Sequence, residues 1–173
     1  DCFVRLADHF VNFIQQDDGF FRSIVRSTHK PPVLDPQNGL HRANDDLGTL
    51  GLLCAYRVTK DRKYLHSIEK FISAVFAKQL DDGMFEESVA CIPIILNTIY
   101  EAGEEIAAEA VTDFRVNKAL QALWEAKVKL TQNSRIYGAL YEEPKAVEPT
   151  VCARANCYTL IVLLKLFANI RDF

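Results

Sequence analysis

The chain has 173 residues, of which 49% are hydrophobic and 25% are charged. This composition excludes a disordered chain and supports one folded domain over residues 1–173. The formal net charge is −3, with Lys and Arg scattered along the sequence, so we expect neither nucleic-acid nor membrane binding. With no signal peptide and no apolar run near the ~20 residues of a membrane-spanning helix, we expect a cytoplasmic protein.

The cysteines point to the same compartment. There are five of them, an odd number, and no Cys-x-x-Cys pair occurs. We therefore expect reduced thiols, no zinc site and no cofactor. These residues are Cys2, Cys54, Cys91, Cys152 and Cys157.

The first predicted hairpin combines two apolar patterns. Residues 3–14 carry apolar side chains at three- and four-residue spacing, which predicts a helix with one buried face. A turn follows, where Gly19 permits the positive φ that ends a helix. After a proline-rich loop at 28–39, residues 47–58 are apolar nearly all round, which predicts a fully buried helix capped by Asn44.

The second hairpin repeats this order. Residues 64–76 form an amphipathic stripe that Asp61 can cap, and a turn follows at Gly83. Residues 89–100 are again apolar nearly all round. Pro93 bends this second helix if the helix begins well upstream, and costs little if the helix begins just before it.

The third hairpin is a degenerate copy. Its amphipathic stripe covers residues 116–130. Trp124 lies in the same outer helix, where we expect it to serve packing. Its turn contains Gly138, and its apolar helix covers residues 158–170, with Thr150 as a candidate cap.

Together these patterns predict an all-α fold of three α/α hairpins in two layers. The half-exposed helices form an outer layer and the fully apolar helices an inner layer. In no segment do apolar and polar residues alternate with a period of two, so we expect no substantial β-sheet. Four aspartates are expected to be turn residues: Asp17, Asp18, Asp81 and Asp82.

Short sequences at the starts of the three inner helices resemble motifs of unsaturated glucuronyl and rhamnogalacturonyl hydrolases. Residues 44–48, Asn-Asp-Asp-Leu-Gly, resemble that family's His-Asp-Leu-Gly motif. Residues 87–95 resemble its next inner helix, which opens with a carboxylate, and residues 153–158 resemble its Arg-Gly-Asn-Gly-Trp motif. The family folds as a six-hairpin (α/α)6 toroid, so the resemblance implies that this chain corresponds to about half of a toroid.

The resemblance implies catalysis by two carboxylates. Asp46 matches the aspartate of the first motif, and Glu87 matches the general acid/base that protonates the double bond of a 4,5-unsaturated uronic acid. Sites for acidic sugars combine carboxylates, cations and aromatic rings. The residues that we expect to bind the oligosaccharide are His41, Arg42, Asp45, Phe85, Tyr141, Arg154 and Asn156.

A second hypothesis needs no catalysis. Asp45 and Asp46 also suit the start of a helix, as do Glu86 and Glu87, because a helix dipole favours acids there. Arg154 can pair with a nearby glutamate among Glu142, Glu143 and Glu148, and Phe20, Phe85 and Tyr141 can seal the core. The chain would then be a non-catalytic hairpin module that binds a protein or glycan. Under either hypothesis, open ends expose apolar edges, so we expect self-association or a second half-domain.

Overall fold

A computed structural model describes residues 2–21, 25–26, 33–34, 42–85, 89, 91–106, 113–128, 137–141 and 144–170. The helices are α1 (Cys2–His9), α2 (Arg42–Thr59), α3 (Lys63–Ala77), α4 (Cys91–Ala102), α5 (Asp113–Glu125) and α6 (Ala153–Ile170). A π-helical turn, η1 (Phe10–Ile14), extends α1, and a 3₁₀ turn, η2 (Gly103–Glu105), extends α4. Two short strands, β1 (Val25–Arg26) and β2 (Val33–Leu34), pair antiparallel. The predicted all-α class is confirmed.

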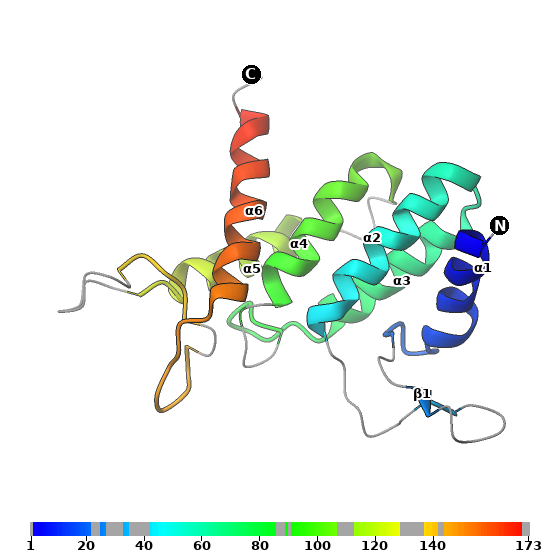
Figure 1. The fold of residues 1–173 in the computed structure, drawn as a ribbon. Helices are drawn as coiled ribbons and strands as arrows, with labels where there is room; N and C mark the ends of the chain where they lie inside the picture. Colours follow the sequence, from blue (N-terminus) through cyan, green and yellow to red (C-terminus); the bar gives the residue numbers. More distant parts are fainter. Residues whose placement is uncertain are drawn as a thin grey trace.

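The helices alternate between an inner row and an outer set. In the inner row, α4 lies between α2 and α6 and packs against both. The outer helix α1 packs on α2, α3 packs on α2 and α4, and α5 packs on α4. Figure 1 shows that α2, α4 and α6 run in the same direction and begin at the same end of the molecule.

Burial differs between the three inner helices. Every residue of α4 from Cys91 to Thr98 is buried, as expected for a helix with neighbours on both sides. In α6, Ala155, Thr159 and Val162 are buried, but Leu160 is 58% exposed. In α2, Leu52, Leu53 and Ala55 are buried, but Cys54 and Val58 are exposed. The prediction of all-round burial is therefore right for α4 and wrong for α2 and α6, because among the described helices each of these two has an inner neighbour, α4, on one side only.

The amphipathic stripe of α3 is confirmed in full. Its Tyr64 and Ile68 are completely buried, and the remaining predicted positions are nearly so. The stripe of α1 is confirmed in part, because Ala7 and Ile14 are buried whereas Phe3 and Leu6 are exposed. The buried positions of α3 are Tyr64, Leu65, Ile68, Phe71, Ile72, Val75 and Phe76.

The predicted helix starts have mixed outcomes. The Asp61 Oδ1 accepts a hydrogen bond from the Lys63 amide, the first of α3, at 3.0 Å, although the residue directly before the helix is Arg62, which makes no side-chain capping bond. The Asn44 cap is wrong because α2 already begins at Arg42, and the Thr150 cap is wrong because α6 begins at Ala153. Pro93 is the third residue of α4, within the first turn, where the amide has no helical partner to lose.

Trp124 does not pack inside the protein. Its side chain is 66% exposed on α5. The Lys127 Nζ lies 3.6 Å from the centre of its ring, a cation–π contact at the surface. The core positions of α5 are Ala119, Ala122 and Leu123 instead, so Trp124 packs on the surface and not in the core.

Candidate functional site

Three glycine turns, one after each outer helix, share one geometry. Gly19, Gly83 and Gly138 have φ values of +90°, +88° and +86°, which favour glycine because they lie in the left-handed region. In the first turn the Gln16 amide donates to the Phe20 carbonyl at 2.9 Å. The predicted internal repeat is therefore present in the backbone.

The same hydrogen bond recurs in the other two turns. The Leu80 amide donates to the Met84 carbonyl, and the Val128 amide donates to the Ala139 carbonyl, both at 2.7 Å. In each case the acceptor is the residue directly after the glycine. The third turn thus keeps the pattern although its chain segment is longer.

The aspartates before the first two glycines shape the turns. The Asp18 Oδ1 accepts from the Phe20 amide, and the Asp82 Oδ1 accepts from the Met84 amide, both at 3.1 Å. The Lys145 ammonium pairs with Asp82 and lowers the pKa of its carboxyl. Both aspartates are turn residues, as predicted.

The predicted catalytic region lies at the starts of the inner helices. Asp45 and Asp46 belong to the first turns of α2, and Arg154 is the second residue of α6. Arg42 is the first residue of α2, but the side chains of these residues lie outside the described part of the structure. His41, Glu86 and Glu87 lie outside the described residues altogether.

The side chain of Phe85 lies in the core. It is 2% exposed, and its ring packs on Phe76 with the centroids 5.6 Å apart. An aromatic ring stacks on a sugar only through an exposed face, and Phe85 has none. The alternative reading, in which this ring seals the core, fits its position.

Asn156 fastens a turn to the start of α6. Its Oδ1 accepts from the Leu140 amide at 2.8 Å, and its Nδ2 donates to the carbonyls of Leu140 and Cys152 at 3.1 and 2.8 Å. Side-chain atoms held by backbone groups in this way position a chain segment. Tyr141, next along the chain, is half-buried, and its amide donates to the Ala126 carbonyl at 3.0 Å.

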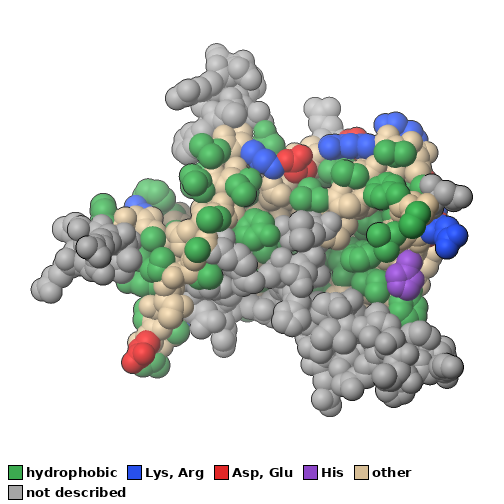
Figure 2. All heavy atoms as spheres, viewed as in Figure 1, with side chains coloured by type: hydrophobic (Ala, Val, Ile, Leu, Met, Phe, Trp, Pro, Cys, Tyr) green, Lys and Arg blue, Asp and Glu red, His purple; other side chains and the backbone are tan. Residues whose placement is uncertain are grey.

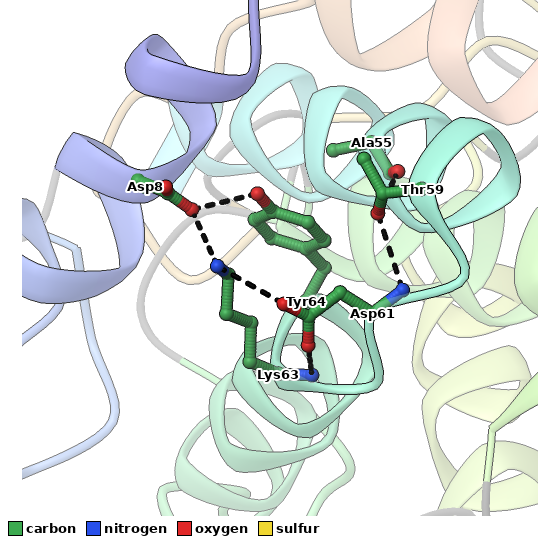
Figure 3. A network of polar contacts seen from close by, with 6 residues as sticks. All are labelled: Asp8, Ala55, Thr59, Asp61, Lys63 and Tyr64. Atoms are coloured by element: carbon green, nitrogen blue, oxygen red, sulfur yellow. Dashed lines mark hydrogen bonds and ion pairs between the residues drawn. The ribbon is translucent and has the colours of Figure 1, made fainter.

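A polar network joins α1 to the start of α3 (Figure 3). The Tyr64 hydroxyl donates to the Asp8 Oδ1 at 2.6 Å, and the Lys63 Nζ lies 2.8 Å from the same oxygen. Lys63 also pairs with the Asp61 Oδ2 at 3.1 Å. The Lys63 ammonium lowers the pKa of Asp8, and burial raises the pKa of the Tyr64 phenol.

This network is a structural tie. The charge of Lys63 is matched by two carboxylates, and Asp8 in turn raises the pKa of Lys63. Thr59 continues the network into the turn between α2 and α3, where its Oγ1 donates to the Ala55 carbonyl and accepts from the Asp61 amide. No sequence pattern predicted the network, because its members come from three separate elements.

A second set of polar contacts holds the inner helices in register. The Thr49 and Thr98 hydroxyls of α2 and α4 lie 2.8 Å apart in the core. At the far ends of the helices, the Lys165 Nζ of α6 donates to the Asn97 Oδ1 at 2.7 Å and pairs with Glu101 of α4. These contacts fix how far each helix is shifted along its neighbour.

Other kinds of site were sought in the described part of the chain. No group of three or more His, Cys, Asp or Glu side chains there is placed to hold a metal ion. All five cysteines are described, and none forms a disulfide. Among the described helices, none combines the length and apolar character needed to cross a bilayer.

Comparison with protein-family models, with curated proteins and with solved structures finds no match to this chain. The resemblance to unsaturated uronide hydrolases therefore stays a prediction.

Proposed function

We propose that this chain is a carbohydrate-processing domain, corresponding to half of an (α/α)6 toroid, that hydrolyses oligosaccharides containing unsaturated uronic acids. One observation carries the proposal: α2, α4 and α6 are adjacent and begin at the same end of the molecule (Figure 1). This arrangement supports a shared site for Asp46 in α2, Glu87 just before α4 and Arg154 in α6.

The proposed chemistry adds water across the double bond of the uronic acid. Glu87, in its protonated form, donates a proton to one carbon of the double bond. A water molecule adds its hydroxyl to the other carbon, and the proton that this water releases returns to the carboxylate. The hydrated sugar then rearranges and the glycosidic bond breaks, so one water is consumed and no cofactor is needed.

A carboxyl group must hold a proton near neutral pH to start this reaction. A neighbouring carboxylate or a desolvated setting raises the pKa of a carboxyl in this way. The sequence pairs of acids, Asp45 with Asp46 and Glu86 with Glu87, supply such neighbours.

Binding of the acidic sugar is proposed for fewer residues than the sequence suggested. Phe85 is buried in the core and the Asn156 amide is held by backbone groups, so neither is assigned to the ligand. The proposed binding residues are His41, Arg42, Asp45, Tyr141 and Arg154. Guanidinium groups suit this task because they bind carboxylates through two hydrogen bonds.

The test is the loss of ultraviolet absorbance from unsaturated uronide disaccharides. The unsaturated uronic acid absorbs, and its hydration removes the chromophore. We expect loss with the native chain and a reduction of about 100-fold or more in Asp46→Asn and Glu87→Gln. Asp17→Asn is the matched control, since Asp17 is an exposed turn residue far along the chain from the inner-helix starts. Equal rates in all four proteins, or no turnover of any uronide, would reject the hydrolase.

A second candidate is a non-catalytic α-hairpin module that binds a protein or a glycan. The exposed apolar side chains at both ends of the helix row favour it, for example Leu6 on α1 and Leu160 on α6. Calorimetry separates the two candidates: uronide binding without turnover, unchanged by Glu87→Gln, indicates the module.

We also propose that the domain works in the cytoplasm and associates with itself or with a second half-domain. Cys54 and Cys157 are exposed and form no disulfide, which fits a reducing compartment. Exposed apolar ends fit an assembly in which a partner covers them.

A further inference from the structure

The first glycine turn is covered by the next outer helix. A Cβ atom built on Gly19 would lie 2.8 Å from both the Lys70 carbonyl oxygen and the Ala74 Cβ of α3. The Lys70 Nζ donates to the Gln16 carbonyl at 3.0 Å, and the Gln15 Nε2 donates to the Ser67 carbonyl at 2.8 Å. The turn can therefore pack closely on α3 because Gly19 lies against the helix backbone at Lys70 and because the neighbouring side chain, Ala74, is small.

The second glycine turn is covered by α5 in the same way. A Cβ atom on Gly83 would overlap the Lys118 carbonyl oxygen and would lie 3.2 Å from the Ala122 Cβ. The Gln79 Nε2 donates to the Arg115 carbonyl at 2.9 Å. The contacting residues have the same spacing in both helices. Ser67, Lys70 and Ala74 of α3 correspond in this spacing to Arg115, Lys118 and Ala122 of α5.

The third glycine turn is open as far as the structure describes the chain around it. Apart from its two chain neighbours, no described residue lies within 4 Å of a Cβ atom built on Gly138. Beside it lies a groove of about 440 Å³ between α5, the turn and α6. Figure 2 shows exposed hydrophobic side chains along α6. We call this surface the C-terminal edge, defined by Trp124, Gly138, Leu140, Leu160 and Leu163.

The C-terminal edge corresponds to the surface that receives α3 in the first hairpin. There, α3 packs on the end of the preceding outer helix, on the turn and on the preceding inner helix. Phe20 and Phe21 of that turn both contact Phe71 of α3. Leu140 follows Gly138 at the interval at which Phe21 follows Gly19, so the third turn presents an apolar side chain at the same place.

We propose that the C-terminal edge binds an α/α hairpin of a second half-domain. Its outer helix lies over Gly138 and carries a basic residue followed four positions later by Ala or Gly, as α3 and α5 do. Its apolar face fills the groove between α5 and α6. This inference concerns assembly and holds whether or not the chain is a hydrolase.

A second copy of this chain is not the occupant. Among the described outer helices, α3 and α5 already cover glycine turns, which leaves α1. In α1 the basic residues Arg5 and His9 are followed four positions later by His9 and Phe13. Neither of these side chains is small enough for the close approach seen at Gly19 and Gly83. The edge therefore selects a helix that the described part of a second copy does not leave free.

The probe is a peptide of residues 61–78, which contains α3 and its Asp61 cap. A hydrocarbon staple between positions 66 and 73, both exposed in the protein, holds the peptide helical without touching the predicted contact face. Fluorescence anisotropy measures its binding to the full chain. The protein variants are Gly138→Asn and Leu160→Glu, both on the C-terminal edge. The matched control is Gly103→Asn, because Gly103 also has a positive φ and open space but lies at the end of α4.

We expect saturable binding to the native chain and to Gly103→Asn. Binding should weaken about tenfold or more, equivalent to ~1.4 kcal/mol, in Gly138→Asn, in Leu160→Glu and with an Ala74→Leu peptide. Absence of binding to the native chain overturns the proposal, as does equal binding by the edge variants. A dimer of the native chain in sedimentation velocity that Gly138→Asn dissociates also overturns it, because the occupant would then be a second copy.

Discussion

The glycine turns make a quantitative prediction about stability. Gly83→Ala and Gly138→Ala introduce the same methyl group at nearly the same φ, +88° and +86°. At Gly138 the added Cβ meets none of the described residues beyond its chain neighbours within 4 Å, whereas at Gly83 it overlaps the Lys118 carbonyl oxygen. The two variants therefore share the backbone strain and differ in the clash.

The magnitudes follow from these two contributions. A left-handed backbone costs a residue with a Cβ about 1–2 kcal/mol, and the reduced freedom of the unfolded chain returns about 0.4–1 kcal/mol. Gly138→Ala should thus lower the free energy of unfolding by about 1 kcal/mol. At Gly83 the backbone of α5 must also move, which adds about 1–3 kcal/mol.

Urea unfolding, followed by the far-ultraviolet circular dichroism of the helices, measures both changes in the free energy of unfolding. Thermal unfolding should show the same order, with about 2–4 °C per kcal/mol for a domain of this size. Gly19→Ala serves as a second clash variant, since its Cβ would lie 2.8 Å from the Lys70 carbonyl oxygen. Equal losses at Gly83 and Gly138 would refute the claim that α5 closes on the second turn.

Two further predictions concern polar contacts. Lys63→Met should destabilise the protein at neutral pH, because the Lys63 ammonium pairs with Asp8 and Asp61. Its difference from the native chain should shrink as the pH falls below the usual aspartate pKa of 3.8, because the Lys63 side chain lowers the pKa of Asp8 and this stabilisation is lost on protonation. The pKa of Asp61 is lowered chiefly by the Lys63 backbone amide, which the variant keeps. A difference in urea midpoint that stays constant between pH 7 and pH 3 would contradict this. Asn156→Ala should speed amide hydrogen exchange at Leu140, because the Leu140 amide donates to the Asn156 Oδ1. Exchange in α4 should stay slow. Unchanged exchange at Leu140 would show that contacts other than those of Asn156 hold the turn.

Periodicity predicted α3 and α4 well because burial in these two helices follows the local pattern. The stripe of α3 and the all-round apolar run of α4 both lie where their patterns require. The glycine repeat was also readable, because only a positive φ explains glycine at the same place in three turns.

The outcomes at α6 and Trp124 depend on neighbours, which a sequence pattern does not specify. Leu160 and Trp124 are apolar and lie in predicted helices, yet both are exposed along the groove between α5 and α6. An apolar side chain indicates a surface to be covered, and the pattern alone does not say whether this chain covers it.

The position of the candidate site stays a prediction, and two of its predicted members have contacts within the fold. The motifs led to the starts of α2 and α6, which lie at the same end of the molecule (Figure 1). Phe85 and Asn156 were chosen for their chemistry, and both serve the fold instead. The Lys-Ala pairs of α3 and α5, four residues apart, are present in the sequence, but only the structure shows that they contact Gly19 and Gly83.

The way the turns are covered sets an order in which contacts can form during synthesis. Gly19 is closed by α3 and Gly83 by α5, so each turn leaves the ribosome before the helix that completes it has been translated. In this protein the first two hairpins each provide the surface on which the next outer helix packs. A nascent chain halted after α4 would leave the Gly83 turn as uncovered as the Gly138 turn is here.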